Sequence, residues 1–186
     1  MQILNEQKKI ALKHKRLLVA SAVLIVLVAA ALFSATVKEE YLFLTNKQSG
    51  QVLFYAPAAS GSFFAVSFIH SVNKSPVTEY YRIEKGQIYL DSLHYYTFGA
   101  GMPSQVEAGQ TLSYADDGAM IIADFNRPMP NLTYNIGRMP AGQILHWQGR
   151  EIPLNTLDAP GQPVLFSAVA YPRLWLALRI YPKLAR

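Results

Sequence analysis

The residue types best suited to chemistry gather between residues 63 and 103. His70 and Ser71 follow an apolar run, and Glu79 follows a short polar loop, Val72–Pro76. If the strands beside that loop pair as a hairpin, His70 and Glu79 lie nearly opposite each other, with Cβ atoms about 4.5–5.5 Å apart. An imidazole and a carboxylate at that distance can hydrogen-bond, which raises the basicity of the histidine. The pair is therefore a general base, half of a metal site or, as we favour, a structural clamp that holds the loop rigid.

We expect neither a catalytic centre nor a metal centre. A metal site needs three or four ligands, and the remaining histidines, His14, His94 and His146, show no ligand spacing. The chain also has no cysteine, which excludes thiolate sites and disulfides. Ser71 and Ser75 are the candidate nucleophiles, but no Gly-x-Ser-x-Gly elbow surrounds either of them. The sequence predicts no enzyme activity, no cofactor and no bound metal.

A glycine-rich loop, Gly99–Pro103, follows a strand-like run at 93–98. It lacks the lysine and the following helix of a phosphate-binding P-loop. We expect Gly99 and Gly101 to adopt positive φ or to permit close backbone approach, and Pro103 to stiffen the exit.

These residues need a scaffold, and the sequence predicts a mainly β one. Short runs rich in Val, Ile, Tyr, Phe and Thr flank turn signals such as Lys85-Gly86, Asp117-Gly118 and Gln148-Gly149. No long amphipathic helix separates them, which favours antiparallel hairpins over βαβ units. We therefore predict an antiparallel β-sandwich or barrel-like domain over residues 38–170.

An apolar segment without charge, Leu17–Val37, precedes this domain. As a helix it would reach roughly 31 Å, enough to cross a hydrocarbon core. The segment 1–16 before it carries five basic residues and one acidic residue, so the positive-inside rule puts that tail in the cytoplasm and the β-domain outside. A cleaved signal peptide is the competing interpretation, and a buried helix of a soluble core is a weaker one.

The C-terminal segment 171–186 carries four basic and no acidic residues. Read as a helix, it is amphipathic and suited to a membrane surface. Its expected interface residues are Arg173, Trp175, Arg179, Tyr181 and Lys183. Read as a strand, Leu174 to Ile180 alternate well, so a final sheet strand is the alternative. Because residues 17–170 hold eight basic and eleven acidic residues, the body of the protein lacks the basic character of a nucleic-acid-binding domain.

Two motifs resemble a known family. They are Phe68-Ile69-His70-Ser71-Val72 with Pro76-Val77-x-Glu79 and Tyr81-Arg82-Ile83, and Phe98-Gly99-Ala100-Gly101-Met102-Pro103. Over roughly Leu42–Leu154 the chain resembles small exported bacterial proteins of unknown function that are encoded beside TAXI-type TRAP transporters. Asn73 departs from the pattern, which would have an acidic residue there.

The resemblance implies a membrane-anchored accessory subunit of such a transporter. The main partner would be the transporter's membrane subunit. Its solute-binding protein is a second expected partner, and membrane lipids are a third. The residues expected to dock or bind are His70, Ser71, Lys74, Pro76, Glu79, Gly99, Ala100, Gly101 and Pro103. The alternative is an independent envelope module that holds a small anion or a lipid near His70, Lys74 and the glycine loop.

Overall fold

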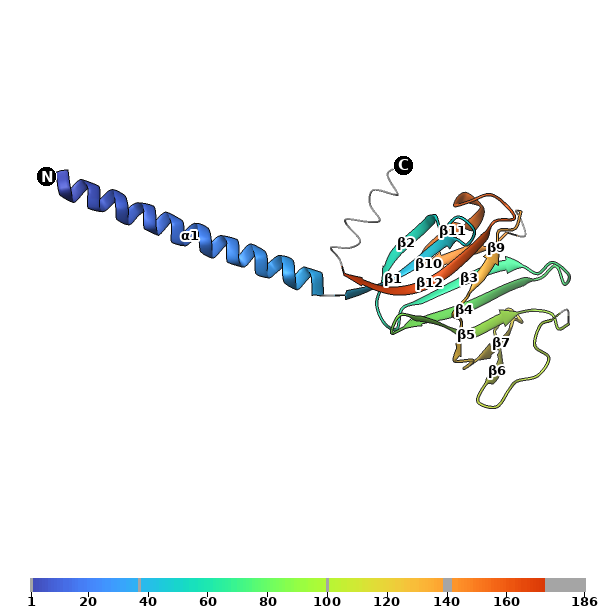
Figure 1. The fold of residues 1–186 in the computed structure, drawn as a ribbon. Coiled ribbons are helices and arrows are strands. Elements are labelled where there is room, and N and C mark those ends of the chain that lie inside the picture. Colours follow the sequence, from blue (N-terminus) through green and yellow to red (C-terminus); the bar gives the residue numbers. More distant parts are fainter. Residues whose placement is uncertain (1, 37, 100, 139–141, 173–186) are drawn as a thin grey trace. The chain divides into compact units, whose positions relative to one another are not determined.

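The protein consists of a long helix and a separate β-domain. The computed structural model describes residues 2–36, 38–99, 101–138 and 142–172, and Figure 1 labels its elements. One compact unit is Glu39–Tyr171. Outside the described residues lie Ala100 and the expected membrane-interface residues Arg173, Trp175, Arg179, Tyr181 and Lys183.

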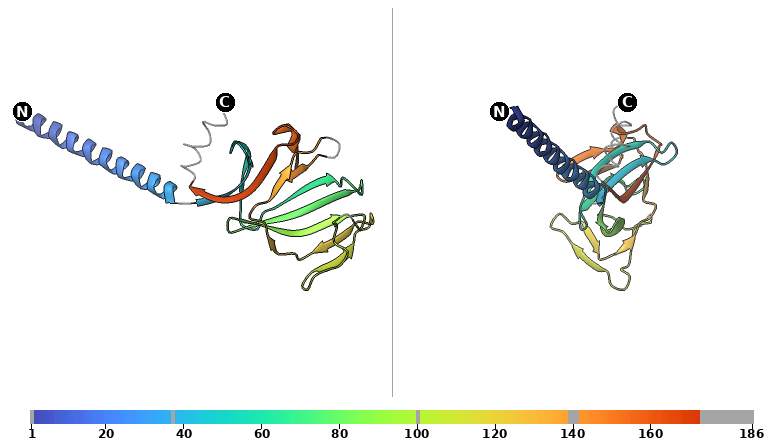
Figure 2. Two further views of the ribbon diagram at one scale, coloured as in Figure 1. Left: turned by 45° about the vertical axis from the view of Figure 1, so that its right-hand side comes forward. Right: turned by 60° about the vertical axis from the view of Figure 1, so that its left-hand side comes forward.

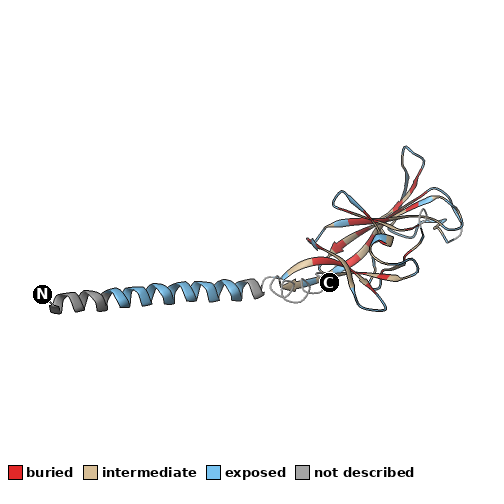
Figure 3. Cartoon of the chain, turned by 90° about the horizontal axis from the view of Figure 1, so that it is seen from above, coloured by how far each residue is buried: buried red, intermediate tan, exposed pale blue. Residues whose placement is uncertain are grey.

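Helix α1 spans Gln2–Thr36 without interruption, so the basic segment and the apolar segment form one helix. No glycine or proline occurs in this range, and lysine, leucine and alanine all favour helix. Its part Leu12–Phe33 is long and apolar enough to cross a membrane, as an anchor or a signal sequence would. The side chains of this part are exposed, as the pale blue helix in Figure 3 shows.

The β-domain is built from two antiparallel sheets, seen from two further sides in Figure 2. The four-stranded sheet has the order β2 (Val52–Ala58), β1 (Lys38–Asn46), β12 (Pro163–Pro172) and β9 (Thr133–Asn135). The eight-stranded sheet has the order β11 (Arg150–Pro153), β10 (Ile144–Trp147), β3 (Phe63–Ile69), β4 (Pro76–Glu84), β5 (Gln87–Tyr95), β7 (Met120–Ala123) and β6 (Thr111–Tyr114), with β8 (Arg127–Pro128) paired to β5. A short 3-10 helix, η1, spans Leu154–Thr156.

The predicted hairpins are confirmed as β1–β2, β4–β5, β6–β7 and β10–β11. The order of the strands is less local than a simple meander. The β10–β11 hairpin adds beside β3, and β12, the last strand of the chain, lies between β1 and β9. The fold therefore depends on pairings between strands that are far apart in the sequence.

The two sheets enclose one main hydrophobic core. Alternate residues of each strand point inward, and the largest fully buried ones include Leu42 on β1, Leu145 on β10 and Phe166 on β12. A smaller cluster lies beneath one end of the eight-stranded sheet. Its buried members are Val77, Leu93, Tyr95, Met120 and Ile122.

Candidate functional site

The loop between β3 and β4 spans residues 70–75, so it begins earlier in the chain than the predicted loop Val72–Pro76. This corrects the expected pairing of His70 with Glu79. In the register of these strands Ile69 faces Pro76, and Glu79 faces Val66. The His70 N–H donates to the Ser75 carbonyl at 2.9 Å, which closes the loop early. Glu79 is therefore separated from the histidine along the strand, and the two do not form a cross-strand pair.

His70 stabilises its own loop by another route. Its Nδ1 atom accepts the backbone N–H groups of Val72 at 3.3 Å and Asn73 at 3.2 Å. The carbonyl of His70 accepts the N–H of Lys74 at 2.9 Å, and Lys74 adopts a positive φ of 55°. A ring that accepts two backbone donors fixes the turn, so the structure supports a structural clamp formed with backbone in place of a carboxylate.

The glycine loop is held at both of its ends. Gly99 and Gly101 adopt φ of 92° and 91°, as predicted, because a left-handed backbone favours glycine. The Met102 N–H donates to the Gly99 carbonyl at 3.0 Å. The hydroxyl of Tyr95, a fully buried residue, donates to the Pro103 carbonyl at 2.7 Å. The loop is thus tied to the smaller hydrophobic cluster.

Asn73 joins the two loops. Its Nδ2 atom donates to the carbonyls of Thr97 and Gly99, each at 3.3 Å. An acidic side chain could not make these bonds because an ionised carboxylate only accepts. Asn73 therefore has a structural role at this position. We call residues 70–75, 97–99 and 101–103 together the loop pair.

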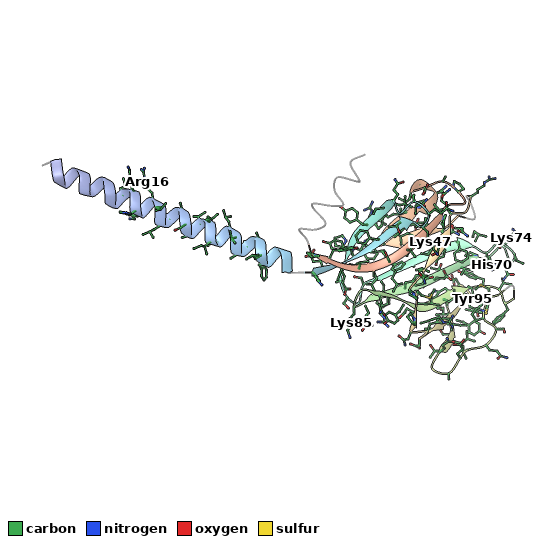
Figure 4. All side chains as sticks on the ribbon, viewed as in Figure 1. Arg16, Lys47, His70, Lys74, Lys85 and Tyr95 are labelled. Atoms are coloured by element: carbon green, nitrogen blue, oxygen red, sulfur yellow. The ribbon has the colours of Figure 1, made fainter. Side chains whose placement is uncertain are left out.

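The loop pair presents a rigid surface at one end of the β-domain, where Figure 4 labels His70, Lys74 and Tyr95. Ser71 and Lys74 are exposed there, as is Pro76, which directly follows the first loop. Two apolar side chains are exposed with them, Val72 at 68% and Phe98 at 48%. Among the described residues, the structure thus brings together the predicted docking residues other than Glu79, and Ala100 lies outside the described residues.

Glu79 lies instead on the inner face of β4, where its partners are two tyrosines and not His70. Its Oε2 atom accepts the hydroxyl of Tyr81 at 3.0 Å and the hydroxyl of Tyr134. The two phenol oxygens are 2.7 Å apart. Burial, together with Glu79 nearby, raises the pKa of Tyr81 well above its usual range, and burial likewise raises the pKa of Tyr134. Both phenols therefore stay neutral and donate to the carboxylate.

Tyr81 could have been found from the sequence, because residues two apart on a strand share a face. Tyr134 comes from β9 in the other sheet and carries no local signal that would connect it to Glu79. The three residues form a polar link across the interior of the sandwich.

A second arrangement that sequence reasoning missed joins Ser67, His146 and Glu151. The Ser67 hydroxyl lies 2.6 Å from His146 Nε2, and His146 Nδ1 lies 3.7 Å from a Glu151 carboxylate oxygen. The order serine, histidine, carboxylate is that of a nucleophile and its base. However, Ser67 sits within β3, which pairs on both sides with β10 and β4. Its neighbouring N–H groups are engaged in the sheet, so they cannot serve as oxyanion donors.

Another histidine, His94, lies on the same sheet with its ring centroid 4.4 Å from that of Tyr80. Burial lowers the pKa of His94, while the carboxylate of Asp117 acts in the opposite direction. Asp117 also accepts the hydroxyl of Tyr96 at 2.5 Å. We assign these contacts to packing of the sheet surface.

Comparison with known proteins found a family model that matches part of this domain. Searches of curated proteins and of solved structures found no match. The matched family segment, 64–154, contains almost all of the eight-stranded sheet and both loops of the loop pair, but not β1, β2 or β12. It is narrower at its N-terminal end than the expected range, Leu42–Leu154. The family model that matches residues 64–154 is DUF1850, a domain of unknown function.

Proposed function

We propose that this protein is a membrane-anchored accessory subunit of a TAXI-type TRAP transporter and that it acts by docking on other proteins. In this proposal α1 anchors the chain in the cytoplasmic membrane with its N-terminus in the cytoplasm. The β-domain then lies on the outer side, and the basic C-terminal segment meets membrane lipids. The transporter link rests on the resemblance of the two sequence motifs.

The loop pair carries the docking part of the proposal. Asn73 ties the two loops together, and His70 fixes the turn between β3 and β4. The loops therefore hold Val72, Lys74 and Phe98 outward with little conformational freedom left to lose. A preorganised surface of this kind lowers the entropic cost of binding a partner. An exposed apolar pair beside a cation also suits a protein partner better than a small polar substrate.

We propose docking in preference to catalysis because the best catalytic arrangement is incomplete. Ser67 has a base in His146 but lies on a flat strand whose backbone donors are already bonded. Stabilisation of a developing oxyanion is usually the largest single contribution to such a reaction. Without it, the contact between Ser67 and His146 serves to join β3 to β10.

Affinity purification from native membranes in a mild detergent tests the proposal. We expect the transporter's membrane subunit to be recovered with the tagged chain. The double variant Val72→Glu, Lys74→Glu should lose that recovery, while the control Lys85→Glu, at the opposite end of the domain in Figure 4, should keep it. Recovery of the chain alone, under conditions that keep the transporter assembled, would contradict the proposal.

A second candidate, an independent envelope module that binds a lipid, is favoured by one observation. A cleft of about 470 Å³ lies between the two sheets near Gly86, and its apolar lining includes Ile88, Met129 and Phe166. An anion at the loop pair is less well supported, because the N–H groups of its tight turn donate to His70.

Lipid binding in this cleft can be separated from docking. Phospholipid added to the detergent-solubilised chain should raise its melting temperature. The variant Met129→Trp, which fills the cleft, should remove that rise. An equal rise in the unmodified chain and in the variant would exclude this cleft as the lipid site.

A further inference from the structure

Strand β6 is an unprotected edge of the eight-stranded sheet, at its outer end in Figure 1. Among the described residues it pairs only with β7, and all four of its residues are exposed. The Ala115 N–H donates to the Ala119 carbonyl at 2.9 Å, just beyond the strand. Because bonded residues alternate in an antiparallel pair, the N–H and C=O groups of Leu112 and Tyr114 point away from β7.

Two side chains of β6 extend the apolar inner face of the sheet but are not buried. Leu112 faces Ile122 and Tyr114 faces Met120, and both partners are buried in the smaller cluster. Leu112 and Tyr114 therefore belong to the inner face of the sheet, yet they are 43% and 67% exposed. Natural edge strands usually carry lysine, proline or an inward charge that discourages pairing with another strand. Strand β6, with the sequence Thr-Leu-Ser-Tyr, carries none of these.

Acidic residues surround this edge. Residues 86–126 contain five acidic residues and no lysine or arginine. Asp91 and Glu107 are paired with arginines outside this range, which leaves Asp116, Asp117 and Asp124. Asp116 and Asp117 lie in the turn after β6. Asp124 accepts the hydroxyl of Thr111, the first residue of β6, at 2.9 Å. Negative charge therefore stands at both ends of the open strand.

We propose that β6 binds an extended, basic segment of a partner protein as an additional strand of the sheet. The backbone of that segment pairs with Leu112 and Tyr114, which supplies affinity, and its apolar side chains cover the inner face. Lysine or arginine residues at its two ends lie near Asp124 and Asp116. This inference does not depend on the identity of the transporter in the proposed function.

A second copy of this chain is a poorer occupant of the edge. Two β6 strands paired antiparallel around a two-fold axis would bring the start of each strand beside the end of the other. Asp124 of one copy would then lie near Asp116 and Asp117 of its partner, and like charges placed opposite each other are destabilising. A basic segment removes this repulsion.

The test uses the full chain in detergent micelles and a fluorescein-labelled peptide. The peptide alternates valine and threonine and has two lysines at each end, and a second peptide replaces every lysine with glutamate. Fluorescence anisotropy should show binding of the lysine peptide, weakened by added salt, and at least about tenfold weaker binding of the glutamate peptide.

Two variants test the edge itself. Leu112→Pro removes an N–H that points away from the sheet, so the hairpin should survive while peptide binding falls about tenfold or more. Asp116→Lys should weaken binding by a similar factor and does not depend on the proline variant folding. Glu151→Lys, on the edge strand β11 at the other end of the same sheet, is the matched control and should bind within about twofold of the unmodified chain.

The outcomes are distinct. Failure of the lysine peptide to bind, or equal binding of the glutamate peptide, would overturn the proposal. So would unchanged binding by a folded Leu112→Pro chain or by Asp116→Lys, or an equal loss in Glu151→Lys. Because this assay contains no transporter component, its result is independent of the purification that tests the proposed function.

Discussion

The link between Glu79 and Tyr134 across the sandwich makes a quantitative prediction. Tyr134→Phe removes a hydroxyl that donates to the Glu79 carboxylate and lies 2.7 Å from the Tyr81 hydroxyl. The ring itself stays in place, since its contact with Phe166, at 5.5 Å between centroids, needs no oxygen. The variant therefore loses a hydrogen bond and leaves almost no cavity.

The size of the effect follows from the charge of the acceptor. A hydrogen bond to a charged group contributes about 1.5–3 kcal/mol, and Glu79 keeps its second donor, Tyr81. We therefore expect the free energy of unfolding to fall by about 2 kcal/mol. For a domain of this size that corresponds to a melting temperature lower by roughly 5–10 °C.

The assay is thermal unfolding of the full chain in detergent, followed by near-ultraviolet circular dichroism. The control is Tyr89→Phe, which removes a hydroxyl bonded at 2.8 Å to the exposed Gln87 and should cost less than about 0.5 kcal/mol. Combining Tyr134→Phe with Glu79→Gln should give a loss smaller than the sum of the two single losses, by about 1 kcal/mol. If Tyr134→Phe and Tyr89→Phe have the same melting temperature, or if the losses of Tyr134→Phe and Glu79→Gln are additive, the link contributes no stability.

Three further predictions concern the same chain. Burial raises the pKa of Tyr81 and of Tyr134, so the folded state keeps these two protons above pH 10 while the unfolded chain loses them. The free energy of unfolding should therefore not depend on these groups below about pH 9, and it should fall above pH 10 by up to about 1.4 kcal/mol per pH unit for each phenol. Denaturant titrations at several pH values should show a smaller slope for Tyr134→Phe. Asn73→Asp should lower the free energy of unfolding by about 1 kcal/mol and accelerate amide hydrogen exchange at Met102, because a carboxylate cannot donate to the glycine loop. Unchanged exchange at Met102 would show that Asn73 does not hold the two loops together. Leu24→Arg should lower the fraction of the protein retained in membranes on alkaline extraction, because arginine at the centre of a spanning helix costs about 2.5–3.5 kcal/mol. Release of the unmodified chain by the same treatment would indicate that α1 does not span.

Local patterns in the sequence were enough for several parts of the structure. The charge-free run within α1 indicated the apolar helix, and glycine at the second position of each turn indicated hairpins such as β4–β5. The positive φ of Gly99 and Gly101 was also predictable, because it depends on the residue type and not on contacts with distant segments. These features depend on residues that are close together in the chain.

The candidate site shows where such reasoning stops. The hydrogen bond from His70 to Ser75 closes the loop earlier in the chain than predicted, so Glu79 lies farther along the strand from the histidine. A small change of register redirects a whole strand, so a pairing inferred across a loop is sensitive to the length of that loop. The role of Asn73 likewise depends on the glycine loop being next to it, although the two are separate in the sequence.

The amino-acid sequence alone was therefore sufficient for the apolar helix, the β character of the domain and the turns that connect its strands. The order of the strands, the Glu79–Tyr81–Tyr134 link and the open edge at β6 required the three-dimensional structure. The reason is that each of these arises when distant segments pack together, as β9 does when it brings Tyr134 to Glu79, and no local periodicity records which segments will meet.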